Sequence, residues 1–176
     1  MIRLAIALFL IAAVPAKAQV PIQEITSPGG ISAWLVEEHS IPFVALEIRF
    51  RGGTSLDLPG KRGATNLMSG LLEEGAADMD SRGFAEAKED LATSIDFDVY
   101  GDVLTVSSRF LTENMDASVD LVRAALVEPT FEDAAVERVR GQVLSYINSR
   151  QTDPDELAGD ALNAAAYGDH PYGSFD

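Results

Sequence analysis

The sequence predicts an α+β fold, a mainly antiparallel sheet packed against helices, and three observations point to it. Residues 31–50 and 95–110 show the period-two alternation of strands. After Gly63, and again after Thr112, apolar residues recur at the i, i+3, i+4 spacing of helices. The resulting order is three strands, two helices, two strands and three helices, which is typical of helices covering one sheet.

The first residues predict a signal peptide. Met1-Ile2-Arg3 is followed by an apolar run of about eleven residues and an Ala16-x-Ala18 cleavage signature. That run is shorter than the ~20 residues of a membrane-spanning helix. We expect residues 1–18 to be removed, the mature chain to begin at Gln19, and the protein to be exported to the bacterial periplasm without inserting into the membrane.

The three strands before the first helix are each bounded by turn residues. Residues 19–30 predict a lead-in strand that ends at Pro28-Gly29-Gly30. Residues 31–37 and 42–50 follow as two alternating strands. Because only Glu38-His39-Ser40 and Ile41 separate them, we expect these two strands to form an antiparallel hairpin.

The remaining elements follow from spacing and from capping residues. An apolar stripe after Gly63 stops at Gly75, and Asp80 is a typical N-cap for a second helix. Residues 95–100 and 103–110 predict strands joined at Gly101-Asp102. Thr112 is expected to cap a third helix, Glu132 or Asp133 to begin a fourth, and Asp153-Pro154 to begin a fifth that ends near residue 168.

Composition restricts the function. The net charge is −15, and removal of Arg3 and Lys17 with the signal peptide makes it −17. Such an acidic chain is not expected to bind nucleic acid or anionic lipid. It could steer basic segments towards itself, although a solvated acidic surface without a specific role accounts for the charge as well. The absence of cysteine excludes disulfides and thiolate zinc sites.

Several short segments, in order and at fitting intervals, resemble the N-terminal domain of the M16 peptidases, the family of insulinase, pitrilysin and the mitochondrial processing peptidase. They are residues 34–37 (WLVE), the strand from Pro42 to Gly53, residues 60–63 (GKRG), residues 128–131 (EPTF) and residues 169–173 (DHPYG). The resemblance implies paired α/β domains. We therefore expect residues 19–176 to form most of the first domain of a longer chain, cut short at its C-terminal end.

The zinc-binding residues of that family are missing. Active members hold zinc with an H-x-x-E-H motif on the helix after Gly63 and with a Glu on the long fourth helix. The matching positions here are Asn66, Ser69 and Gly70, and residues 142–148 (QVLSYIN) contain no carboxylate. We therefore predict no catalytic residue, no metal site and no cofactor, and we expect Gly70 to mark close packing.

The resemblance also implies that peptide adds as a strand to an exposed sheet edge. The matching strand is Ile95-Asp96-Phe97-Asp98-Val99-Tyr100. Strand addition needs only backbone groups, so peptide binding can persist without catalysis. Its acids, with Asp102, would favour basic peptides; acids that prevent edge-to-edge aggregation are an equally good interpretation.

The remaining candidate residues have simpler structural roles. His39 and His170 are the only histidines, and a metal pair between them is conceivable, but we expect surface or loop positions for both. Glu73-Glu74 could serve as a base or as metal ligands, and we expect them at the solvated end of their helix. No Gly-x-Ser-x-Gly motif or phosphate-binding loop is present.

The sequence thus predicts a non-catalytic M16-type subunit, inactive by itself, that pairs with a homologous H-x-x-E-H-bearing subunit and helps bind peptide substrate. A stand-alone peptide-binding or scaffold protein is the alternative. An active zinc endopeptidase with unusual ligands is a less favoured third hypothesis.

Overall fold

The computed structural model describes residues 21–173. The predicted signal peptide and Gln19 therefore lie outside the described residues. The chain divides into a short unit that ends at Ile41 and a larger unit that begins at Pro42. Within residues 21–173, no helix is both long and apolar enough to cross a membrane.

The first unit is a two-stranded hairpin. Strand β1 (Ile22–Thr26) pairs antiparallel with β2 (Ser32–Val36), from Ile22 opposite Val36 to Thr26 opposite Ser32. Gly30, at φ +84°, takes the left-handed conformation that the tight connection requires.

The Pro28-Gly29-Gly30 turn closes a hairpin between β1 and β2 within the first unit. In the larger unit, strand β3 (Phe43–Arg51) pairs along its full length with β7 (Val103–Leu111), which is equally long and lies far away in the sequence. A hairpin between residues 31–37 and 42–50 would join the two units and stays a prediction.

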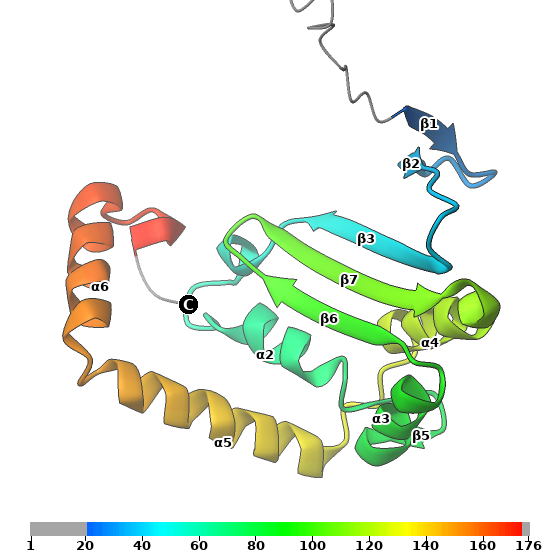
Figure 1. Ribbon diagram of the computed structural model, residues 1–176. Coiled ribbons are helices and arrows are strands. Elements are labelled where there is room, and N and C mark those ends of the chain that lie inside the picture. The colour runs from blue at the N-terminus through cyan, green and yellow to red at the C-terminus, as the bar shows by residue number, and fades with distance from the viewer. Residues whose placement is uncertain (1–20, 174–176) are drawn as a thin grey trace, which may run out of the picture. The chain divides into compact units, whose positions relative to one another are not determined.

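The larger unit contains a three-stranded antiparallel sheet in the order β3-β7-β6, and the predicted hairpin of β6 (Ser94–Val99) with β7 is confirmed. Helices α2 (Ala64–Leu71), α3 (Ser81–Asp90) and α4 (Met115–Val127) lie on one face of this sheet (Figure 1). A small pair, β4 (Gly75–Ala76) and β5 (Met79–Asp80), precedes α3.

The core lies between the sheet and these helices. Its members are almost fully buried and come from both layers: Ala76, Phe84, Ile95, Val106, Leu121, Val122 and Ala125. A smaller cluster joins α2 to α5 (Asp133–Arg150) through Leu71, Ala135 and Val139. Helix α6 (Pro154–Tyr167) follows, and the chain then turns through the 3₁₀ segment η3 (Pro171–Gly173).

Two predicted helix starts are confirmed by their hydrogen bonds and one is wrong. The Asp80 carboxylate accepts from the Gly83 amide, and the Asp153 carboxylate accepts from the Asp155 amide. Thr112 does not cap α4: a 3₁₀ turn, η2 (Thr112–Asn114), intervenes, and the Thr112 hydroxyl donates to the Pro42 carbonyl.

Candidate functional site

The three positions that match the zinc motif lie on α2, which begins at Gly63 in the left-handed conformation. Asn66 is half-buried at the wall of a pocket. Ser69 is buried, and its hydroxyl donates to the Asn66 carbonyl at 2.8 Å. A serine hydroxyl is a very weak base at neutral pH, so Ser69 cannot activate water as a glutamate at this position would.

Gly70 lies where α2 packs against α5. A Cβ atom built at this position would be 3.3 Å from Val139 Cγ1, which is tighter than most side-chain contacts. The helices therefore approach each other closely where the glycine removes a side chain. The prediction that Gly70 marks close packing is confirmed.

A pocket of about 830 Å³ lies between α2, α5 and the end of β6. It brings together Asn66 and Gln142, the latter from the stretch that matches the family's third ligand. The lining residues come from three elements and are mostly apolar or amide-bearing: Arg62, Gly63, Asn66, Val99, Tyr100, Gln142, Val143, Tyr146 and Ile147. Of the three α2 motif positions, only Asn66 lines the pocket, whereas Ser69 and Gly70 do not.

The side chains of this pocket do not fit zinc. Zinc in proteins is held by imidazole, thiolate or carboxylate groups, usually four in a tetrahedron. The polar side chains of this pocket are two amides, two phenols and one guanidinium, and none of them is an imidazole, thiolate or carboxylate. Across residues 21–173, no group of three or more His, Cys, Asp or Glu side chains is placed to hold a metal ion.

Strand β6 forms one edge of the sheet. It pairs with β7 on one side, and no described strand pairs with its other side. Ile95 is buried, Phe97 and Val99 are partly buried, and Ser94, Asp96 and Asp98 are exposed. Among the described strands β6 (Ser94–Val99) is thus an edge strand, one residue earlier than the predicted 95–100, and Val99 and the following Tyr100 belong to the wall of the 830 Å³ pocket. Peptide binding at this edge stays a prediction.

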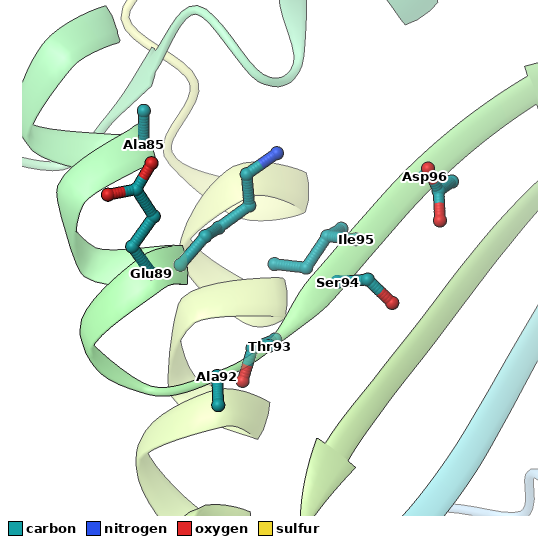
Figure 2. Close-up of a pocket in the computed structure, with 8 residues that line it drawn as sticks. Ala85, Glu89, Ala92, Thr93, Ser94, Ile95 and Asp96 are labelled. Carbon is teal, nitrogen blue, oxygen red and sulfur yellow. The ribbon is translucent and has the colours of Figure 1, made fainter.

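A second hollow, of about 520 Å³, lies at the start of β6, beside the end of α3. Figure 2 shows its lining: Ile95 points towards the helices, whereas Ser94 and Asp96 point away from them. Lys88 and Glu89 make its α3 side charged. Hollows therefore lie at both ends of β6, and the one at its end is the more apolar of the two.

The C-terminal turn η3 is tied to the loop that follows β6, a contact that no local sequence pattern indicates. Tyr172 donates its hydroxyl to Asp102, and Ser55 donates to the same carboxylate at 3.0 Å. The Tyr172 hydrogen bond lowers the pKa of Asp102, and the same bond raises the pKa of Tyr172. Arg62, in the pocket wall, donates to the Pro171 carbonyl at 3.4 Å.

The two histidines occupy surface or loop positions. The His39 side chain is 85% exposed and lies 3.4 Å from a Glu37 oxygen. His170 precedes η3, and its Nδ1 accepts from the Tyr172 amide at 3.2 Å. Its ring also makes an edge contact with the Tyr172 ring, which accounts for its position by packing within the turn.

Glu73 and Glu74 do not form a freely solvated helix end. Lys88 pairs with Glu73, while Arg138 makes two hydrogen bonds to Glu74, one of them at 2.9 Å. The Glu74 side chain is only 17% exposed, and the Arg138 hydrogen bonds hold its pKa below the usual value. These carboxylates connect α2 to α3 and α5, so the expectation of solvated side chains is wrong for Glu74.

Substituting Arg138→Met should lower the free energy of unfolding, because it leaves the Glu74 carboxylate, whose side chain is only 17% exposed, without its cation. The stabilisation exists above the unfolded-state pKa of Glu74 and is lost as pH falls through its lower folded-state pKa. Urea unfolding between pH 7 and pH 3 measures both effects. The exposed Arg82–Glu86 pair supplies the control, since Arg82→Met should change stability by less than about 0.5 kcal/mol; equal losses in the two variants would contradict the assignment.

Comparisons with known proteins agree on one family. The model of the insulinase family, peptidase family M16, matches residues 33–175. A protein of Helicobacter pylori named "Non-peptidase homolog YmxG" is 30% identical over 135 residues, which are 77% of this chain and 31% of that protein. The "Uncharacterized zinc protease YmxG" of Bacillus subtilis is 19% identical over 152 residues, which are 86% of this chain and 37% of that protein.

Solved structures show the same architecture. The crystal structure described as a peptidase M16 inactive domain from Pseudomonas fluorescens superposes with a TM-score of 0.83 at 26% identity, over 88% of this chain and 38% of that one. The crystal structure of a protease from Helicobacter pylori superposes with a TM-score of 0.77 at 15% identity, over 89% of this chain and 38% of that one. At this identity the likeness shows a shared fold and nothing further. The chain thus spans between 31% and 38% of the length of these relatives. It belongs to the insulinase family, peptidase family M16, and its sequence contains no H-x-x-E-H motif.

Proposed function

We propose that this chain is the non-catalytic subunit of an M16-type peptidase, that it pairs with a homologous subunit bearing H-x-x-E-H, and that it helps bind peptide substrate. One observation carries the proposal. A pocket lies between α2, α5 and the end of β6, and of the three α2 motif positions only Asn66 lines it, with an amide where the family has a zinc ligand.

Two relatives support the non-catalytic part of the proposal. The names of the Helicobacter pylori and Pseudomonas fluorescens proteins call them a non-peptidase homolog and an inactive domain. The unpaired edge of β6 supports the peptide-binding part, because an extended peptide can add to such an edge through backbone hydrogen bonds. The N-terminal sequence supports export to the periplasm.

Affinity purification of the full-length protein from its own cells tests the pairing. We expect a homologue that contains H-x-x-E-H to copurify, and the tagged chain to begin at Gln19. Adding the protein to that homologue should raise its kcat/KM for peptides. A stand-alone scaffold would copurify with no such homologue, and a homologue whose activity is unchanged by the addition would contradict the proposal.

A further inference from the structure

We infer that the peptide bound at β6 is an extended segment in which basic residues alternate with large apolar ones, and that one apolar side chain enters the pocket at the end of β6. This inference rests on the peptide-binding part of the proposed function and names the class of peptide. It follows from how the two faces of β6 differ.

The two faces of β6 have opposite chemistry. Ile95, Phe97 and Val99 face the helices, as their burial shows, whereas Asp96 and Asp98 face away from them. Side chains directly opposite each other in paired strands project from the same face of the sheet. A strand added to the free edge would therefore place every second side chain beside the two carboxylates and the intervening ones on the helix side.

The carboxylates of this edge are available to a basic partner. Within residues 21–173, neither Asp96 nor Asp98 has an ion pair or a side-chain hydrogen bond. Their partners on β7 are the neutral Ser107 and Thr105. Arg109 lies diagonally across from Asp96 and forms no ion pair with it. The net charge of −15 adds long-range attraction for a basic segment.

The helix side of the same edge ends in an apolar hollow. Val99 and Tyr100 continue from β6 into the wall of the 830 Å³ pocket, where Val143, Tyr146 and Ile147 form the α5 side. A pocket of this size, mostly apolar with a few polar groups, suits a large apolar side chain. The amides of Asn66 and Gln142, which replace ionisable ligands, carry no charge that would oppose such a guest.

Binding of three capped nine-residue peptides to the full-length protein, measured by calorimetry, tests the inference. In the first peptide Lys and Phe alternate; the second has the same residues with lysines and phenylalanines in separate blocks; the third has Glu in place of Lys. We expect the alternating peptide to bind roughly tenfold tighter than the block peptide. The Glu peptide should bind more weakly than both.

Variants of the chain test the contributions of the two faces of β6 to binding one at a time. The double substitution Asp96→Asn with Asp98→Asn should lower the affinity for the alternating Lys–Phe peptide by roughly three- to tenfold at low salt. The loss should be smaller at high salt, because salt screens the attraction between charges. Asp116→Asn with Asp120→Asn removes the same charge from exposed positions of α4 and should leave binding unchanged. Gln142 is exposed and lines the pocket, so Gln142→Trp would occupy part of the space meant for phenylalanine. This variant should bind the alternating Lys–Phe peptide more weakly, while its affinity for an alternating Lys–Ala peptide should not change.

The possible results have different meanings. Equal affinity for the alternating and block peptides would overturn this inference and leave peptide binding intact. An unchanged affinity in the Asp96 and Asp98 variant would show that these acids only discourage edge aggregation, which also overturns it. Binding of none of the peptides would overturn the inference together with the peptide-binding part of the proposed function, while copurification would still decide the pairing.

Discussion

Rebuilding the zinc motif by the triple substitution Asn66→His, Ser69→Glu and Gly70→His is expected to lower the free energy of unfolding by about 3 kcal/mol. Ser69 is buried, at 7% exposure, so a glutamate there would place a carboxylate in an apolar interior. A side chain at position 70 would press on Val139, because even a Cβ atom there lies 3.3 Å from Val139 Cγ1. We expect well under one zinc per chain, because residues 142–148 supply no carboxylate for the third position.

Urea unfolding and elemental analysis after dialysis against zinc measure both expectations. The unsubstituted protein is the reference for zinc content. Asn66→His alone is the control for stability, because Asn66 lies half-buried at the pocket wall, and it should change the free energy of unfolding by less than about 0.5 kcal/mol. A triple variant as stable as the parent and carrying one tightly held zinc would mean that the frame still accommodates the metal.

Gly53→Ala should lower the free energy of unfolding by about 2–4 kcal/mol. Gly53 is buried, and a Cβ atom built there overlaps the carbonyl oxygen of Tyr100. The same carbonyl accepts from the Thr54 amide at 3.1 Å. The added methyl group would therefore displace the backbone at the end of β6, where the pocket wall begins, and peptide affinity should fall together with stability.

Thermal unfolding and the peptide titration described above measure the two effects of Gly53→Ala. Gly141→Ala is the matched control: this glycine lies inside α5 with open space around it. Alanine there should stabilise the chain by about 0.5–1 kcal/mol, since it favours the helix. Two variants that shift stability in the same direction would refute the steric argument.

Local signals in the sequence identified most of the elements correctly. The change of apolar period at Gly63, the caps at Asp80 and Asp153, and the Gly101-Asp102 turn all depend on neighbouring residues, and each is found at the predicted position. The motif positions could likewise be placed on α2 by resemblance. Gly70 indicated close packing because a glycine inside a helix lowers helix stability, a cost that a close contact with a neighbouring helix can offset.

Long-range partners could not be predicted in the same way. Nothing near Phe43 or Arg51 in the sequence specifies that β3 pairs with β7, about sixty residues later in the chain. Glu74 looked like a solvated helix end because its partner, Arg138, lies on α5. The bond of Asp102 to Tyr172 also joins residues far apart in the chain.

The sequence by itself determined which chemistry the motif positions lack, because Asn66, Ser69 and Gly70 cannot supply imidazole or carboxylate in any fold. It also determined the alternation of acids along β6, since side-chain alternation is a property of any strand. Only the tertiary structure decided that Asn66, Gln142 and Tyr100 line one pocket and that, among the described strands, none covers the outer edge of β6. These features depend on how α2, α5 and the sheet pack, and packing arises from contacts between residues that are distant in the chain.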